Sequence, residues 1–213
     1  MVHIQPKKHE FGWKPHGEDS SVHLEQGLEI RYTTDGSKPT RQSALFKKPF
    51  KIKSGELRAI AFSRDNKGSE ASVKFGILKT DWKLLASDSH IDEHIGKLAF
   101  DENTTSYWKS KASGQFHYIN IDLGKTKTLT GFAYTPQTRS SDGMIEKGII
   151  KISTNGVHWK VLETFEFGNL INDPVRRIHN FKNTTQTRYI RIESTVIAGA
   201  NTSAAIAELD FFE

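Results

Sequence analysis

The sequence, 213 residues long, predicts an all-β protein made of two modules. Apolar and polar residues alternate with a period of two along most of the chain, which is typical of half-buried strands. Turn-forming pairs interrupt these runs, most clearly Asn155-Gly156, a strong hairpin signal. The sequence lacks the repeated strand–helix units that an α/β barrel or a doubly wound sheet requires. A sandwich or jelly roll of short strands is therefore expected.

The first module is expected over residues 1–79. LEIRYTT (28–34) and ELRAIAF (56–62) predict two strands, and Asp35 in the turn between them is expected to accept backbone hydrogen bonds. The stretch IRYTTDGSKPTRQSALFKKPF (30–50) resembles the small Ig-like or fibronectin-like domain found at the C-terminus of chitobiases and β-hexosaminidases. The resemblance implies a small Ig/fibronectin-like sandwich.

The second module is expected over residues 80–213. Its predicted strands are FHYINIDLG (116–124), TLTGFAYT (128–135), KGIIKIST (147–154), HWKVLETFEF (158–167), RYIRIEST (188–195) and IAELDFF (206–212). Together with KLAFDENTTSYW (97–108), these stretches resemble in order the coagulation-factor type C, or discoidin, domain. That fold is shared with galactose-binding carbohydrate-binding modules of family 32. The resemblance implies an eight-stranded β-sandwich jelly roll.

As a pair, the modules resemble the C-terminal region of secreted exo-glycosidases, namely α-L-fucosidases and β-N-acetylhexosaminidases. The resemblance implies a non-catalytic accessory region, with an α-L-fucosidase as the favoured parent. Weak glycan binding or substrate positioning is expected, with the catalytic domain of the same parent chain as a partner. The implied location is periplasmic or extracellular. The alternative is a structural spacer that docks on the catalytic domain without binding glycan.

Composition supports a soluble, well-packed protein. Apolar residues make up 36% of the chain and aromatic residues 10%, enough for a sizeable core. The absence of cysteine excludes a disulfide framework and a thiol nucleophile. No apolar run approaches the ~18 residues of a membrane span, so none is expected. Basic residues are concentrated in the first module, but KKPFKIK (47–53) alternates with apolar residues like a strand, so no nucleic-acid partner is expected.

The stretch HIDEH (90–94) matches the H-x-x-E-H pattern of one class of zinc peptidases. Such a site requires a helix that places His90 and His94 on one face, and a third ligand on a second helix. Ile91 and Ile95 fall at helical spacing, so a short helix capped by Ser89 is expected, with both histidines directed outward. No second helix is evident in the sequence, so a zinc-dependent hydrolase is the least favoured of three functions.

The loop DENTTSYW (101–108) is a candidate cation site because Asp101, Asn103 and Thr105 alternate, as oxygen ligands of calcium often do. The type C resemblance implies a structural Ca²⁺ and adds Glu208 from the closing strand. The full implied ligand set is Ala99, Asp101, Asn103, Thr105, Ala207 and Glu208, with the two alanines contributing carbonyl oxygens. The alternative is that Asp101 caps the turn and Glu208 pairs with a lysine.

The expected ligand face consists of four loops at one end of the second module. These loops are SDSHID (87–92), WKSKASG (108–114), PQTRSSDG (136–143) and IAGANTS (197–203). Galactose-binding relatives place a histidine after the loop tryptophan, an aromatic platform three residues further on and an arginine after Y-x-P. This chain has Lys109, Ala112 and Gln137 at these positions, which argues against ordinary galactose recognition.

Arg139 is expected to replace the missing arginine, because its planar guanidinium can bind adjacent hydroxyls. The full candidate glycan-binding set is Arg139, Lys109, His90, Asn201 and Gln137. Trp108 and Trp159 are expected in the core. The sequence shows no pair of carboxylates in a pattern typical of a glycosidase site, which needs them ~5–9.5 Å apart across a sugar. No hydrolysis of glycosides is therefore expected.

Overall fold

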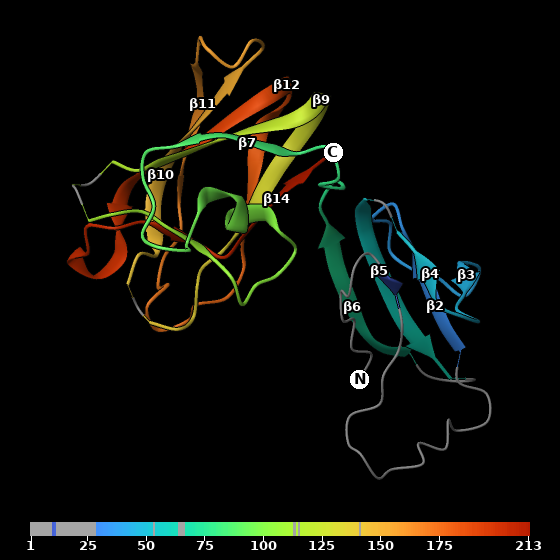
Figure 1. Cartoon of the computed structure of the whole chain (residues 1–213). Helices are drawn as coiled ribbons and strands as arrows, with labels where there is room; N and C mark the ends of the chain where they lie inside the picture. The colour runs from blue at the N-terminus through green and yellow to red at the C-terminus, as the bar shows by residue number, and fades with distance from the viewer. Residues whose placement is uncertain are drawn as a thin grey trace. The chain divides into compact units, whose positions relative to one another are not determined.

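The computed structural model describes residues 10–11, 29–52, 54–63, 67–112, 114, 116–140 and 142–213. The chain divides into two compact units, Met1–Ile77 and Leu78–Glu213. Both units are built from antiparallel strands (Figure 1). Among the described residues, no helix has the length and apolar character needed to cross a membrane.

The first unit contains a four-stranded antiparallel sheet and a two-stranded pair. The strands are β1 (Glu10–Phe11), β2 (Glu29–Thr33), β3 (Ala44–Leu45), β4 (Phe50–Lys51), β5 (Gly55–Phe62) and β6 (Lys67–Phe75). The larger sheet has the order β3-β2-β5-β6, and β1 pairs with β4. The predicted strands over 28–34 and 56–62 are thus confirmed as β2 and β5. Along β5, Leu57 and Ala59 are fully buried and face the core.

The turn after β2 has the predicted chemistry. The Oδ1 atom of Asp35 accepts a hydrogen bond from the backbone N–H of Ser37 at 3.0 Å and another from the Ser37 hydroxyl at 2.6 Å. These bonds lower the pKa of Asp35. Gly36 has a φ of +79°, which an L side chain rarely adopts. Asp35 therefore accepts a turn bond, as predicted.

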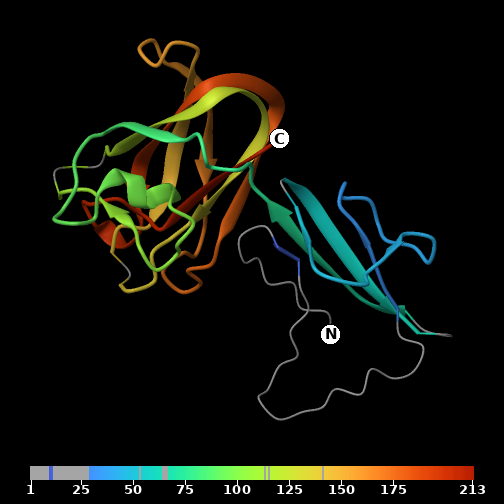
Figure 2. The same cartoon turned by 45° about the vertical axis from the view of Figure 1, so that its right-hand side comes forward.

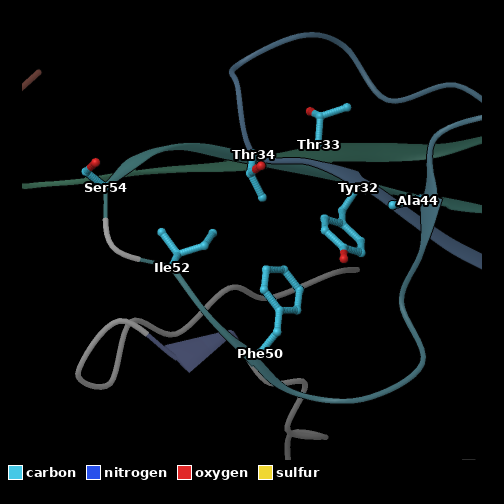
Figure 3. A pocket seen from close by; sticks show the side chains of 7 residues that line it. All are labelled: Tyr32, Thr33, Thr34, Ala44, Phe50, Ile52 and Ser54. Atoms are coloured by element: carbon cyan, nitrogen blue, oxygen red, sulfur yellow. The ribbon is translucent and has the colours of Figure 1, made fainter.

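A hollow of about 480 Å³ opens on the first unit beside the stacked rings of Tyr32 and Phe50, whose centroids are 4.6 Å apart. Ile52 and the hydroxyls of Thr34 and Ser54 line the rest of it (Figure 3). Tyr32 and Phe50 also pack against the core residues of this unit. The hollow is therefore continuous with the packing of the sheet.

The second unit is larger. Its elements are β7 (Lys83–Ser87), η1 (Gly96–Phe100), β8 (Trp108–Lys109), β9 (Tyr118–Thr135), β10 (Ile145–Ser153), β11 (Lys160–Glu166), β12 (Arg177–Ile197), η2 (Ala198–Ala200), β13 (Ala205–Ile206) and β14 (Glu208–Phe212). The main sheet has the order β11-β10-β12-β9-β14, with β7 also pairing with β9, and β13 pairs with β8. This is the antiparallel β-sandwich that the sequence predicts.

Two long strands, β9 and β12, run through both halves of the sandwich. The first part of β9 pairs with β7 and the last part with β14, while β12 accompanies β9 on both sides of a register shift. The predicted strands over 116–124 and 128–135 are therefore one continuous, bent strand (Figure 1). As a result, both ends of β9 reach the same side of the unit.

The core of the second unit is aromatic. Phe132 is fully buried, and its ring centroid lies 5.2 Å from that of Phe165 and 6.3 Å from that of Phe211. Trp108 is buried, as predicted. The expectation for Trp159 was wrong: the side chain is half-buried and its ring packs against the guanidinium of Arg191, whose Cζ lies 4.8 Å from the ring centroid.

Candidate functional site

The four loops expected to form a ligand face lie together on one side of the second unit. Both views show the described parts of these loops on the side away from the C-terminus, namely 87–92, 108–112, 136–140, 142–143 and 197–203 (Figure 1, Figure 2). Three of the loops follow the ends of β7, β9 and β12, and β10 begins shortly after the loop over 136–143. Hydrogen bonds between the loops then fix them relative to one another, as described below.

Lys109 lies at the base of this face rather than on its surface. Its Nζ atom is 2.5 Å from Oδ2 of Asp142, and Oδ1 of the same carboxylate accepts a bond from the Ser203 hydroxyl at 3.3 Å. The side chain of Lys109 is 20% exposed. Lys109 thus joins three of the loops through Asp142, and its ammonium group is largely engaged within the protein.

Gln137 is buried, with 2% of its surface exposed. Its Oε1 atom accepts hydrogen bonds from the backbone N–H groups of Arg139 and Ser140, and its Nε2 atom donates to the carbonyl oxygens of Ser140 and Asp142. Such a network shapes the loop over 136–143 and leaves little of the amide for a ligand. The structure therefore assigns Gln137 to support of the loop, in contrast to its predicted contact with glycan.

Arg139 is exposed at the tip of that loop. Among the described residues, its guanidinium has no hydrogen bond or ion pair, so its five donors face solvent. His90 is also exposed. Asn201 is half-buried and donates from Nδ2 to the carbonyl of Ala198, which closes η2. Of the five predicted residues, Arg139 and His90 are the ones whose side chains remain fully available.

Sequence reasoning missed an exposed aromatic side chain that follows one of these loops in the chain. Phe116 is 69% exposed, because β9 begins two residues later at Tyr118. The predicted strand includes residue 116, whereas in the structure Phe116 belongs to the loop before β9. A phenylalanine directly after the Ser-Gly-Gln run at 113–115 was the signal available in the sequence.

The HIDEH stretch is not helical. Residues 90–95 form a turn in which the His94 N–H donates to the carbonyl of Ile91 at 2.9 Å, and Asp92 has a φ of +44°. The helix η1 begins only at Gly96, so the predicted helix capped by Ser89 was wrong. His94 stacks on Tyr107, with ring centroids 4.1 Å apart. The zinc-peptidase pattern requires a helix, so its geometry is not met.

The predicted cation loop is held by its own side chains. Asp101 accepts bonds from the Asn103 N–H at 3.0 Å and the Ser106 hydroxyl at 2.7 Å. Asn103 in turn accepts two bonds from Thr105. All three predicted side-chain ligands in the loop are exposed. Asp101 thus caps the turn, as the alternative interpretation proposed.

Glu208 lies in a buried cluster of charges. One carboxylate oxygen, Oε1, contacts the ammonium of Lys79, which also lies 2.9 Å from Oδ1 of Asp210. Desolvation by burial raises the pKa of Glu208 to about 7, against the opposing effect of Lys79, and the nearby Asp101 adds to the rise. Burial would also raise the pKa of Asp210, but Lys79 and Arg176 together hold it below its usual value.

Part of the predicted calcium ligand set fits a cation. Oε2 of Glu208 is buried and has no hydrogen-bond partner among the described residues, and such an atom costs free energy unless a donor or cation meets it. Asp101 is close enough to raise the pKa of Glu208. Ala99, in η1, and Ala207, directly before β14, are both fully buried. Within the described part of the chain, no group of three His, Asp or Glu side chains is arranged to hold a metal ion, so a cation here depends also on amide, hydroxyl and carbonyl oxygens.

Comparison with known proteins places this geometry in a family. The model of the F5/8 type C domain matches residues 83–209, and that of the Fn3 associated domain matches residues 22–75. A sialidase from Micromonospora viridifaciens is 28% identical over 116 residues. That match covers 52% of this chain and 17% of the sialidase, so the chain spans a small part of this relative.

Solved structures share the fold of the second unit. The family 32 carbohydrate-binding module of Clostridium perfringens NanJ, in complex with galactose, has a TM-score of 0.58 and 22% identity, covering 65% of this chain and 98% of that one. The C-terminal domain of a chitobiase from Bacteroides fragilis has a TM-score of 0.56 and 24% identity, covering 64% and 95%. With its type C match extending over more than half of its residues, the chain belongs to the F5/8 type C domain family.

Proposed function

We propose that the chain is a non-catalytic accessory region of a secreted glycoside hydrolase and that its second unit binds glycan weakly at the loop face. The observation that carries this proposal is the exposed guanidinium of Arg139, without a partner among the described residues, on loops that internal bonds hold in place. A sugar site combines an apolar platform with a few polar groups. Phe116 offers the first and Arg139 the second.

Three further features of the proposal extend to the parent protein. An α-L-fucosidase is the favoured parent because the order of the two modules resembles that of such enzymes. The location is then extracellular or periplasmic, and the catalytic domain of the same chain is a partner. A catalytic β/α barrel encoded in frame beside this region supports the proposal. An adjacent domain with no hydrolase character counts against it.

The second candidate function is a structural spacer, and one observation favours it. Lys109, Gln137 and Asn201, three of the five predicted ligand-binding residues, are engaged in bonds within the protein. A spacer keeps its folded loops but binds no sugar. Glycan titration distinguishes the two functions, since both predict the same fold.

We expect a dissociation constant of roughly 1 mM for the best simple sugar, or about −4 kcal/mol of binding free energy.

Arg139→Ala and Phe116→Ala should each weaken binding about tenfold, because the first removes charged hydrogen bonds and the second removes the platform. The test is calorimetric titration with galactose, N-acetylgalactosamine, fucose and fucosylated oligosaccharides. Lys125→Ala, which removes an exposed charge from β9, is the matched control and should leave affinity unchanged. Micromolar affinity that survives Arg139→Ala contradicts the assignment.

We also propose a structural Ca²⁺ held by Glu208 and Asp101, with Asn103, Thr105 and the carbonyl oxygens of Ala99 and Ala207. Bound calcium would neutralise the buried charge of Glu208 and join the loop to the closing strand.

A ligand at a hundredfold excess over its dissociation constant stabilises the folded state by about 2.7 kcal/mol. Calcium should therefore raise the melting temperature, and Asp101→Ala should abolish the rise. Magnesium, which prefers a smaller octahedral site, serves as the control ion. An identical rise in wild type and in Asp101→Ala would show that calcium acts elsewhere.

A further inference from the structure

A single buried histidine contacts three of the four loops of the ligand face. His117 is 1% exposed and directly precedes β9. Its Nδ1 atom lies 2.8 Å from Oδ2 of Asp88 in the loop over 87–92. Its Nε2 atom lies 2.8 Å from the carbonyl oxygen of Thr202 and 3.3 Å from that of Gly114.

Within the described part of the chain, the oxygen atoms at hydrogen-bond distance from the two ring nitrogens belong to a carboxylate and two backbone carbonyls. Asp88 accepts the backbone N–H of Tyr118 at Oδ1, at 3.0 Å, and the Ser89 hydroxyl at Oδ2, at 2.9 Å. Both oxygens of Asp88 therefore accept hydrogen bonds, as the oxygens of an ionised carboxylate do. The other two partners are backbone carbonyls, which only accept. A neutral imidazole has one N–H group and one unprotonated nitrogen. The lone pair of that nitrogen would then face the lone pair of an acceptor oxygen, which is repulsive.

We infer that His117 is held as the imidazolium ion and that it positions the glycan-binding loops, because its two N–H groups join Asp88 to the carbonyl groups of Gly114 and Thr202. This role deepens the proposed function, on which its consequence for glycan affinity rests. Asp88 is the one charged side chain that contacts the ring among the described residues. On the side of β12, the Ser194 hydroxyl accepts the backbone N–H of His117 at 3.0 Å.

The same junction extends into the loop over 108–114. The Lys111 N–H donates to the Ser89 hydroxyl at 3.0 Å, and the indole N–H of Trp108 donates to the Ser89 carbonyl at 2.9 Å. Asp88 and Ser89 thus hold that loop from one side while His117 holds it from the other. Phe116, the proposed platform, is the residue immediately before His117, so the imidazolium also fixes where its ring emerges.

The charge state is tested first on the wild-type protein by nitrogen NMR of labelled histidine at neutral pH. Both ring nitrogens of His117 should show the shifts and couplings of N–H groups. A bare ring nitrogen at neutral pH overturns the inference. This measurement requires no substitution and no sugar.

The positioning role is tested by hydrogen exchange on His117→Gln, which can retain the bond to Thr202, and on His117→Leu, which can retain neither. Amide exchange in 87–92, 108–112 and 197–203 should become about tenfold faster in His117→Leu, with a smaller effect in His117→Gln. His158→Gln, at an exposed histidine, is the matched control and should change none of these segments. Faster exchange confined to the residues next to position 117 overturns the positioning role. If His117→Leu does not fold, unchanged exchange in His117→Gln overturns it instead.

Sugar affinity is the readout that a purely structural role would not move. His117→Gln should weaken binding about tenfold while the strands keep wild-type protection. If the wild type binds none of the sugars, the proposed function fails, and the exchange and NMR results still decide the role of His117. If the wild type binds and His117→Gln binds equally well, the positioning role fails and the proposed function stands.

Discussion

Replacement of Lys79 by methionine is expected to destabilise the second unit by about 3–5 kcal/mol, the usual cost of breaking a buried ion pair by removing one partner. The side chains of Lys79 and Glu208 are 6% and 7% exposed, and the same ammonium lies 2.9 Å from Asp210. Removing it leaves the buried Glu208 and the half-buried Asp210, with Arg176 as the remaining cation among the described residues, at 3.0 Å from Asp210. Chemical denaturation followed by a probe of the second unit measures the change.

Lys125→Met provides the control for the Lys79 substitution, because it makes the same chemical change at an exposed site and should alter stability by less than about 0.5 kcal/mol. A loss below about 1 kcal/mol in Lys79→Met would contradict the pairing of Lys79 with both carboxylates. In that case either a bound cation compensates Glu208 or Glu208 is protonated, since burial already raises its pKa to about 7. A calcium chelator would lower stability only in the first case.

Phe132→Ala is expected to lower the free energy of unfolding of the second unit by about 3–5 kcal/mol, because it deletes the central ring of the core. Phe132 is fully buried and its ring contacts those of Phe165, Phe167 and Phe211. The cavity that remains is lined by aromatic rings, which cannot collapse into it without leaving their rotamers. The melting temperature of the second unit should fall accordingly.

Phe116→Ala is the matched control for this substitution, since it removes the same side chain from a site that is 69% exposed. Its effect on stability should stay within about 0.5 kcal/mol. Similar losses in the two variants would contradict the assignment of Phe132 to the core and of Phe116 to the surface.

The parts of the fold that the sequence predicts are those with a local cause. Alternation over 28–34 and 56–62 yields β2 and β5, and Asn155-Gly156 closes the hairpin between β10 and β11, with Gly156 at a φ of +74°. Each depends on neighbours within a few residues. The continuity of β9 and β12 could not be predicted in this way, because their bends are set by pairing with distant strands.

The contacts that the sequence does not specify at the candidate site have a non-local cause. The pairing of Lys79 with Glu208 joins residues 129 positions apart, and no periodicity marks it. Trp159 is expected in the core from the sequence, whereas the guanidinium of Arg191, which comes from β12, packs over its ring. HIDEH has helical spacing, but the hydrogen bond between the Ile91 N–H and the Lys109 carbonyl holds this segment against β8 as a turn.

The glycan-binding roles of Arg139 and His90 stay predictions, and the structure shows only the exposure of their side chains. A ligand-binding role requires that exposure. Lys109, Gln137 and Asn201 were chosen by position alone, and their internal partners, such as Asp142 for Lys109, come from other segments of the chain. Whether a polar loop residue supports the loop or faces a ligand is decided by those partners.

Chemical-shift mapping by NMR shows directly whether the loop face of the second unit binds glycan. Galactose and N-acetylgalactosamine should be titrated up to on the order of 10 mM, well above the expected dissociation constant. We expect the largest changes in amide chemical shift at the four loops and Phe116, that is, in 87–92, 108–116, 136–143 and 197–203. Arg139 and Phe116 should be among the residues that change most. Shifts centred on Tyr32 and Phe50 in the hollow of the first unit, or no shifts at all at the highest concentration, would contradict glycan binding at the loop face.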